Sequence, residues 1–327
     1  MSKFLLLTHD ITDPYFNLAS EEYLLRQKTE YFIYLWINSP AVIVGVNQNA
    51  LQEVDLAYTD AHGIKVVRRQ TGGGAVYHDL NNLCYTVIAP YDEKVDNYRK
   101  FTAPVIEYLN SLGVKAEFSG RNDIVIDGKK ISGNAQTVVN GRIMHHGTLL
   151  FDTDTSVLTA ALKPNKLKIE SKGIKSIRAR VTNIKEYLPD MTVADFKKGL
   201  SEFFAKDCEN YRLTDGDIAA IKALVKNKYS TYEWNIGRSP KGKNLFEYKF
   251  PFGIFSLYFD TEEGKMKNVE ITGDFFSFKD VKEFVRSLQG TKFTKADIER
   301  AFNSVGEYVK GASGKEIADK MFSPDNK

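Results

Sequence analysis

The apolar residues of this chain fall largely in short continuous runs, which are typical of buried strands. Runs at residues 31–37, 41–45 and 83–89 predict three such strands. Between these runs, residues 13–27 and 98–112 carry apolar side chains at helical spacing, and each segment predicts an amphipathic helix. The first half of the chain is therefore expected to alternate between strands and helices.

Two further details follow from the same pattern near the N-terminus. The short apolar run of residues 4–8 ends at His9 and Asp10, so it predicts an edge strand. In the first helix, Glu21 and Glu22 are interpreted as acids placed early, where they favour the positive end of the helix dipole.

Residues 124–131 predict a β-hairpin, because two apolar arms flank an Asp-Gly turn at 127–128. Side chains alternate along a strand, so Lys130 and Ser132 are expected on one face and Lys129 on the other. That face is solvated if the intervening isoleucine packs in the core. If a ligand cleft lies on it instead, Lys130 and Ser132 enter the cleft together.

The residue composition and the hydrophobic pattern change near the end of the chain. A turn-rich, charged stretch at 238–243 is typical of a linker. Two aromatic strand runs and two amphipathic helices follow, and Thr294 is the expected N-cap of the last helix, over 294–309. We therefore expect a larger domain over residues 1–243 and a small α+β domain over residues 244–327.

Composition narrows the class of protein. Of 327 residues, 43% are hydrophobic and 27% charged, as in an ordinary globular protein. The net charge of +3 is too mild to predict nucleic-acid binding and suits an acidic small molecule or protein partner. Two cysteines give neither a disulfide framework nor a metal-binding spacing. With no signal peptide and no membrane-length apolar run, the cytoplasm is the expected compartment.

The stretch from 66 to 79, VVRRQTGGGAVYHD, carries the strongest chemical signal. Three consecutive glycines at 72–74 let the backbone approach a ligand, and successive amides can surround an anion. Arg68 and Arg69 add positive charge, which predicts a phosphate or carboxylate site. The motif is neither a P-loop nor a Rossmann fingerprint. The alternative is a glycine hairpin between two strands with solvated arginines.

Several other residues are candidates for a ligand pocket. Trp36 lies in a predicted strand and is either a core residue or a pocket wall. Cys84 lies within an apolar strand, which favours an inert core thiol over a nucleophile. His145 and His146 are adjacent on a strand, so at most one faces a site and the pair is a poor metal chelate. The basic residues 163–180 predict either a solvated loop or one that orders on a phosphorylated ligand.

Five motifs in order give these features a family context: DPYFNLASEEYLL, RRQTGGGAVYHD, GRNDIVIDGKKISGNAQ, HHGTLLFD and KGIKSIRARVTN. Together they resemble the lipoate–protein ligases. The resemblance covers residues from about 10 to 190 closely, and the small C-terminal domain fits the long form of the family. Many members have serine where this chain has Thr71, and the hydroxyl is kept.

The resemblance implies an α/β (α+β) fold, with a biotin/lipoate ligase-like catalytic domain of mixed β-sheets flanked by helices and an accessory domain. It implies that lipoate and ATP react to lipoyl-AMP and pyrophosphate, with Mg²⁺ as cofactor. The lipoyl group would then pass to a lysine of lipoyl domains of 2-oxoacid dehydrogenase complexes or of the glycine-cleavage H protein. Neither nucleic acid nor membrane is an expected partner.

The resemblance also implies roles for individual residues. Lys130 matches the family lysine, and a fixed cation that spans carboxylate and phosphate would make it catalytic. Residues 163–180 match the adenylate-binding loop. Asp123 is the expected Mg²⁺ ligand. Residues expected to bind ATP or lipoyl-AMP are Arg69, Thr71, Gly74, Ala75, Val76, Tyr77, Asn122, Asp123 and Lys130. Residues expected to bind lipoate are Trp36, Arg69, Gly72, Gly73, Gly74, His78, Cys84, Lys130 and His146.

Three alternatives to an ATP-dependent lipoate ligase are open. An octanoyl or lipoyl transferase on the same fold needs a reactive cysteine, and Cys84 and Cys208 fit that role poorly. A non-catalytic lipoate-binding module would not need a catalytic lysine, so the presence of Lys130 argues against this alternative. A biotin ligase is disfavoured by the wording of the motifs.

Overall fold

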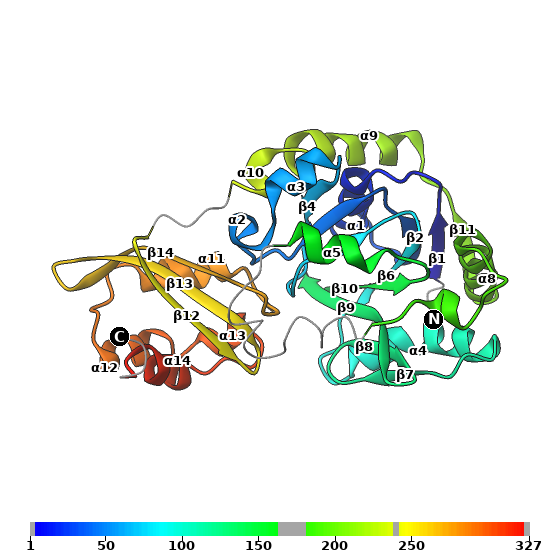
Figure 1. Ribbon diagram of the computed structural model, residues 1–327. Coiled ribbons are helices and arrows are strands. Elements are labelled where there is room, and N and C mark those ends of the chain that lie inside the picture. Colours follow the sequence, from blue (N-terminus) through cyan, green and yellow to red (C-terminus); the bar gives the residue numbers. More distant parts are fainter. Residues whose placement is uncertain (1–3, 163–180, 238–241, 324–327) are drawn as a thin grey trace.

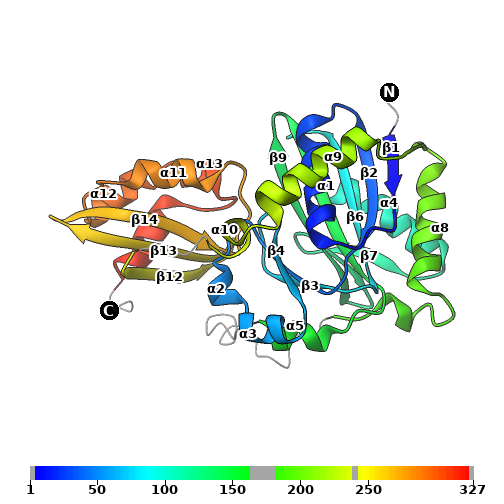
Figure 2. The same ribbon diagram turned by 90° about the horizontal axis from the view of Figure 1, so that it is seen from above.

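The computed structural model describes residues 4–162, 181–237 and 242–323. They form a larger part on an eight-stranded sheet and a smaller part on a three-stranded sheet, and the two parts lie side by side (Figures 1 and 2). A second three-stranded sheet belongs to the larger part. Because helices flank mixed sheets, the expected α/β architecture is confirmed.

The large sheet contains β1 Phe4–Thr8, β2 Tyr31–Ile37, β6 Asn82–Pro90, β7 Ala116–Ser119, β8 Asp123–Ile126, β9 Lys129–Val139, β10 Arg142–Leu150 and β11 Cys208–Tyr211. Their order is β11-β1-β2-β6-β10-β9-β8-β7. The pairs β11–β1 and β1–β2 are parallel, and the other pairs are antiparallel.

The prediction that the first strand is an edge strand is wrong. Phe4 pairs with Cys208 on one side and with Tyr31 on the other, so β1 lies inside the sheet. The outer strand β11 has two exposed polar residues in its middle, Glu209 and Asn210. No hydrophobic pattern marks it, and only its long-range pairing with β1 makes it a strand.

Helix α1, Pro14–Gln27, contacts the large sheet on one side and helix α9, Asp215–Leu224, on the other. The Asp13 side chain caps α1 by accepting a hydrogen bond from a backbone amide at 3.2 Å. The helix is buried along most of its length, including Glu21 and Glu22. These two acids lie in the middle of α1 rather than early in it, so their expected role at the helix dipole is wrong.

Two separate cores lie on the two faces of the large sheet. Alternate residues of β2 point to opposite faces, so that Leu35 packs in one core and Trp36 in the other. The Leu35 core is covered by α4, Asn97–Ser111, and α8, Val193–Ala205. The Trp36 core is covered by α1. Trp36 therefore belongs to the layer of the molecule that α1 completes.

The second sheet of the larger part has the order β4-β3-β5, from β3 Ala41–Val44, β4 Lys65–Arg68 and β5 Val76–His78. The glycine loop at 69–75 joins the two outer strands, which do not pair with each other. The alternative of a simple glycine hairpin is therefore wrong. Short helices complete this part: α2 Ala50–Glu53, α3 Leu56–Ala61, α5 Thr155–Ala161, η1 Ile184–Glu186, η2 Val225–Tyr229 and α10 Tyr232–Asn235.

The smaller part is an antiparallel sheet with helices and a core of its own. Its elements are β12 Asn244–Phe250, β13 Gly253–Glu262, β14 Lys265–Gly273, α11 Val281–Leu288, α12 Lys295–Ala301, α13 Val305–Tyr308 and α14 Gly314–Met321. Thr294 caps α12 as predicted. The helix predicted over 294–309 is divided between α12 and α13. The division of the chain at residues 243 and 244 stays a prediction.

Backbone contacts join the two parts directly. The Gly73 amide donates to the Phe275 carbonyl at 3.2 Å, and the Gly273 amide donates to the Asn47 carbonyl at 2.7 Å. A Cβ added at Gly72 would lie 2.3 Å from the Phe275 carbonyl oxygen. The smaller part therefore packs against the bare backbone of the glycine loop, where a side chain has no room.

We expect Gly72→Ala to separate the glycine loop from Phe275. The new methyl group meets backbone that cannot rotate away, so the hydrogen bond from Gly73 must lengthen or break. Hydrogen exchange at the Gly73 amide should then accelerate. Gly74→Ala is the matched control, because a Cβ at Gly74 has no heavy atom within 4 Å. Equal exchange in both variants would contradict the packing described here.

Candidate active site

A cavity of about 580 Å³ opens between the glycine loop, strands β8–β10 and the smaller part. The expected site residues that line it are Trp36, Arg69, Gly73, Gly74, Ala75, Val76, His78, Cys84, Asn122, Asp123, Lys130 and His146. Thr71, Gly72 and Tyr77 do not line it. Thr71 is fully buried, Gly72 packs against Phe275, and Tyr77 packs in a separate hydrophobic cluster. Residues of the smaller part, including Phe250 and Phe276, form a wall that no local sequence signal indicated.

The first loop arginine, Arg68, anchors the loop from behind. Its guanidinium is fully buried and donates to the carbonyls of Gly45 at 2.8 Å, Gln48 at 2.6 Å and Asn235 at 3.0 Å. These carbonyls belong to two segments that lie far apart in the sequence, residues 45–48 and residue 235. The alternative with solvated arginines is therefore wrong, and Arg68 has a structural role.

The second arginine, Arg69, shapes the loop from within. Its Nη2 donates to the carbonyls of Gly72 at 2.6 Å and Gly74 at 2.9 Å. Its Nη1 donates to the Ile43 carbonyl at 3.1 Å, and its Nε donates to Thr71 Oγ1 at 2.9 Å. Burial lowers the pKa of Arg69 to about 10. The guanidinium thus holds the loop in shape by donating hydrogen bonds to its backbone carbonyls.

This clamp, formed by the Arg69 guanidinium on the carbonyls of Gly72 and Gly74, decides where the amides of Gly73 and Ala75 point. The carbonyl and the following N–H of a trans peptide point in opposite directions, so carbonyls turned toward Arg69 turn the next amides away from it. The Gly73 amide meets Phe275. The amides of Gly74 and Ala75 have no hydrogen-bond partner among the residues that the structure describes. Both residues line the cavity, where two free successive amides are suited to an anion.

The predicted hairpin is confirmed, with Asp127 and Gly128 at its turn in the left-handed region. A β-bulge interrupts it, because Val125 pairs with Lys130 whereas Ile124 pairs with Ser132. The bulge breaks the alternation of side chains. Lys130 lines the cavity, but Ser132 is fully buried. The prediction that both enter one cleft is therefore wrong.

Lys130 is held in the cavity by its surroundings. Its Nζ lies 2.7 Å from Asp123 Oδ1, and both side chains are about one-third exposed, at 37% and 35%. A Cβ at Gly133 would lie 2.9 Å from the same Nζ, so the ammonium group packs on bare backbone. Asn122 is fixed beside this pair, since its Nδ2 donates to the Asn134 carbonyl at 2.6 Å.

The other end of the cavity is buried and mostly apolar. Trp36 Nε1 donates to Thr86 Oγ1 at 2.9 Å, which fixes the indole as a wall. Asn38 Nδ2 lies 3.0 Å from His78 Nδ1, and Cys84 Sγ lies 3.6 Å from the same nitrogen. Burial lowers the pKa of His78 to about 3 and raises the pKa of the Cys84 thiol well above its usual value.

The two adjacent histidines face opposite ways, as predicted. His146 lines the cavity, whereas His145 lies in the aromatic layer between Tyr98 and Phe101. No group of three or more metal-binding side chains occurs in the described parts of the chain. Two carboxylates of the described residues line the cavity, those of Asp123 and Asp274.

Glu21 is a buried carboxylate that sequence reasoning missed. It is 1% exposed and contacts both His146 and Thr86. Its position in an amphipathic helix gave no signal, because acids usually lie on the solvated face. The predicted adenylate-binding residues 163–180 lie outside the described residues. Of the residues on either side, Leu162 lines the cavity and Val181 pairs with Lys130.

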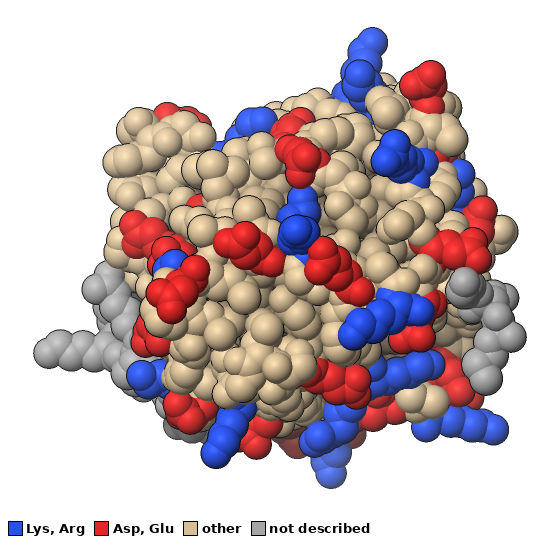
Figure 3. Space-filling model, turned by 90° about the vertical axis from the view of Figure 1, so that its right-hand side faces the viewer, with Lys and Arg blue, Asp and Glu red and all other residues tan. Residues whose placement is uncertain are grey.

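The described residues contain no helix long and apolar enough to span a membrane. On the face drawn in Figure 3, acidic and basic side chains are interspersed. This face therefore presents no broad surface of one sign.

Family models match the chain in two places. The model described as lipoyl protein ligase A/B catalytic domain matches residues 13–205, and that of the bacterial lipoate protein ligase C-terminus matches residues 239–321. The lipoate-protein ligase LplJ of Bacillus subtilis is 45% identical over 298 residues, which cover 88% of this chain and 90% of that protein. The chain therefore belongs to the lipoate–protein ligase family, and the resemblance read from its motifs is confirmed.

Solved structures agree with this assignment. LipL1 of P. falciparum, in complex with lipoate, superposes with a TM-score of 0.80 at 27% identity, covering 97% of this chain and 98% of that one. A bipartite lipoate protein ligase of Thermoplasma acidophilum, described with its E2 lipoyl domain, gives 0.66 at 31% identity, with 75% and 100% covered. Lipoate-protein ligase A bound with ATP gives 0.63 at 29% identity, with 72% and 99% covered.

We expect the Cys84 thiol to resist alkylation in the native protein. Its raised pKa leaves less thiolate at any given pH, and neutral His78 supplies no positive charge to stabilise one. Iodoacetamide labelling at neutral pH should be slow in the folded Cys208→Ser variant, in which Cys84 is the one remaining cysteine, and fast after unfolding. Rapid labelling of the folded variant would contradict the environment described for Cys84.

Proposed function

We propose that this protein activates lipoate with ATP and then transfers the lipoyl group to a lysine of an acceptor protein. One observation carries the proposal. The free amides of Gly74 and Ala75, the Lys130–Asp123 pair and the apolar wall at Trp36 all line the same cavity. An apolar acyl chain and a phosphate can therefore be held in one place, as an acyl-adenylate requires.

In the first step, a lipoate carboxylate oxygen attacks the α-phosphorus of ATP. An oxygen–phosphorus bond forms, the bond to the leaving pyrophosphate breaks, and the product is lipoyl-AMP. Both reactants are negative, so a cation fixed between them lowers the barrier. Lys130 supplies that cation. The amides of Gly74 and Ala75 donate hydrogen bonds to the phosphate or carbonyl oxygen, and Arg69 contributes by orienting the Ala75 amide.

In the second step, a lysine amine of the acceptor attacks the lipoyl carbonyl carbon. An amide bond forms, AMP leaves with the carboxyl oxygen it had gained, and the amine loses a proton. The enzyme needs no nucleophile of its own in either step. The protonated Cys84 and neutral His78 serve as walls for the acyl chain, together with Trp36 and His146.

Mg²⁺ is the cation we propose for the nucleotide. It is commonly bound through one or two carboxylates together with substrate phosphates. Asp123 lines the cavity and has the oxygen chemistry that Mg²⁺ prefers, and Asn122 lies beside it. When bound, the ion would neutralise part of the phosphate charge. Asp123 would hold it and also keep Lys130 in place.

For the acceptor, we propose lipoyl domains of 2-oxoacid dehydrogenase complexes or the glycine-cleavage H protein. Support comes from the Thermoplasma ligase, which is described together with its E2 lipoyl domain. We further propose that residues 1–243 carry out the chemistry and that residues 244–327 close the cavity. The contacts of Phe250 and Phe276 with the cavity support that division.

A single assay separates this proposal from its rivals. Lipoate-dependent exchange of pyrophosphate into ATP should be observed, with octanoate and biotin compared in parallel. A non-catalytic binding module gives no exchange with any acid. An acyl transferase that uses a thioester gives none either, and it would be inactivated by Cys84→Ser. We expect Cys84→Ser to keep its exchange activity.

Lys130→Ala should lower the rate of lipoyl-AMP formation by about a hundred- to a thousandfold, the usual cost of one charge-assisted contact at a transition state. Lys129→Ala is the matched control, because Lys129 is exposed on the same strand. It should leave the rate unchanged. Single-turnover formation of lipoyl-AMP measures both variants. Comparable losses in the two would overturn the role given to Lys130.

A further inference from the structure

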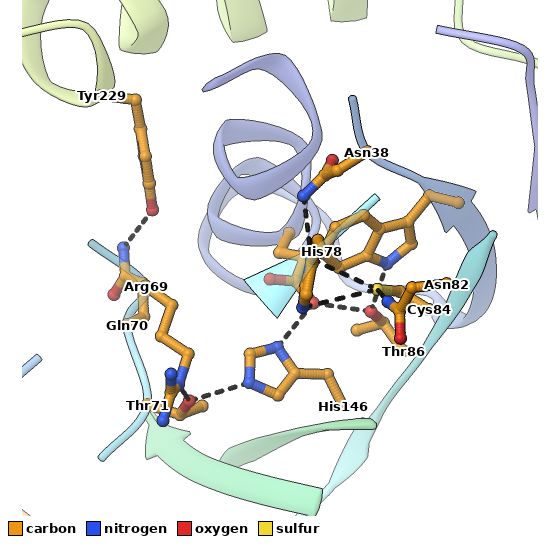
Figure 4. A network of polar contacts seen from close by, with 12 residues as sticks. Asn38, Arg69, Gln70, Thr71, His78, Asn82, Cys84, Thr86, His146 and Tyr229 are labelled. Carbon is orange, nitrogen blue, oxygen red and sulfur yellow. Dashed lines mark hydrogen bonds and ion pairs between the residues drawn. The ribbon is translucent and has the colours of Figure 1, made fainter. Parts of the chain in front are cut away.

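A continuous chain of buried hydrogen bonds runs from Glu21 on helix α1 to the glycine loop. Glu21 Oε1 lies 2.9 Å from His146 Nδ1, and His146 Nε2 lies 2.8 Å from Thr71 Oγ1. Thr71 Oγ1 in turn lies 2.9 Å from Arg69 Nε. Figure 4 shows His146, Thr71 and Arg69 in this sequence of contacts. This series of hydrogen bonds thus links helix α1 to Arg69, which clamps the loop carbonyls.

The donors and acceptors of this chain fit one direction. Arg69 Nε can only donate, so Thr71 Oγ1 accepts from it. Glu21 accepts from Thr86 at 2.6 Å and, as a carboxylate, also accepts from His146 Nδ1. In the neutral imidazole, Nε2 is then an acceptor, and the Thr71 hydroxyl donates to it. Both ring nitrogens of His146, the Thr71 hydroxyl, Arg69 Nε and Glu21 Oε1 therefore all have partners, and a network bonded in this way holds its side chains rigidly.

The hydrogen-bond chain also places a negative charge where it can balance Arg69. The Arg69 guanidinium is buried, and burial without a counter-charge is costly. The Glu21 carboxylate raises the pKa of Arg69, which burial lowers. Glu21 is therefore the counter-ion of the loop clamp, although three hydrogen bonds separate the two charged groups.

The same contacts have the connectivity of an acid–imidazole–hydroxyl triad, but the geometry excludes a nucleophile. Thr71 is fully buried, does not line the cavity, and accepts a hydrogen bond from Arg69. A substrate carbonyl has no access to its hydroxyl. The chain is therefore suited to holding Arg69 in place.

We propose that Glu21 is a positioning residue, which acts through His146, Thr71 and Arg69 to aim the amide of Ala75 at the substrate phosphate. The inference rests on the proposed function, since it assigns the support of that same anion site. Arg69 turns the carbonyls of Gly72 and Gly74 inward. Loosening any link lets these peptides rotate, which disturbs the contact of the Gly73 amide with Phe275 and misdirects the Ala75 amide.

Helix α1 offers a matched control for this proposal. Glu22 is also buried, but it bonds to Lys228 at 2.7 Å and to Tyr229 at 2.8 Å, and through Tyr229 it reaches the Gln70 side chain rather than Arg69. Glu22→Gln and Glu21→Gln therefore remove the same charge from the same helix. A purely structural effect lowers stability in both and leaves the kinetic constants of the folded fraction alone.

The experiment measures kcat and the KM for ATP in lipoate-dependent pyrophosphate exchange, with active sites counted by lipoyl-AMP bound per chain. Glu21→Gln should lose about ten- to a hundredfold in kcat/KM for ATP, as expected when a buried polar partner is lost. Glu22→Gln should keep the wild-type constants per active site. Equal constants in the two variants would overturn the proposal.

Thr71 supplies a second test that does not depend on the folding of Glu21→Gln. Thr71→Val keeps the shape of the side chain and removes the hydroxyl, so it should show the same loss in kcat/KM for ATP. Thr71→Ser restores the hydroxyl and should recover most of the rate. Equal activity of Thr71→Val and Thr71→Ser would overturn the proposal.

Failure of the proposed function is distinguishable from failure of this inference. If the wild-type protein performs no lipoate-dependent exchange, the proposed function is wrong. If the wild type is active and the Glu21 and Thr71 variants are as active as their controls, the positioning role alone is wrong.

Discussion

The site depends on two guanidinium groups buried behind a loop of glycines. Removing a charged group from water is costly, and the cost is recovered only when every donor finds a well-placed acceptor. Arg68 and Arg69 find theirs in backbone carbonyls from several segments of the chain. The conformation of a loop that glycine alone would leave free is therefore fixed by the requirement to satisfy these donors.

This arrangement changes how a basic motif beside glycines is to be interpreted. The sequence suggests that the arginines bind the anion themselves. In the structure the Arg69 guanidinium donates to carbonyls of its own chain, and the free donors are the amides of Gly74 and Ala75. The Ala75 amide lies on the other side of a peptide whose carbonyl Arg69 holds. The charge of Arg69 is balanced from within by Glu21. A substrate in the cavity consequently meets Lys130, a solvent-accessible cation paired with Asp123, and does not meet two unpaired arginines.

Local signals were sufficient for the elements that local forces determine. The Asp-Gly turn, the Asp13-Pro14 helix start and the Thr294 cap each act within a few residues, and the structure has all three. Long-range contacts account for the rest. Strand β11 exists because it pairs with β1. The bulge that separates Ser132 from Lys130 depends on register, and Glu21 is buried because His146 arrives from a distant strand. None of these leaves a periodic mark in the sequence.

The contact between the glycine loop and Phe275 adds a final constraint. Phe275 of the smaller part accepts a hydrogen bond from the amide of Gly73, and the amides of Gly74 and Ala75 stay free. An anion can therefore bind the loop while the cavity wall at Phe276 stays in place, and the wall keeps water from a reactive anhydride. Transfer to a lysine makes the opposite demand, because an amine carried by another protein must reach the same carbon. The two parts have separate hydrophobic cores and meet through backbone hydrogen bonds, polar side chains and the ring contact of Phe276 with Tyr98. Such an interface can meet both demands more readily than a continuous core could, since backbone hydrogen bonds exchange easily with water once exposed.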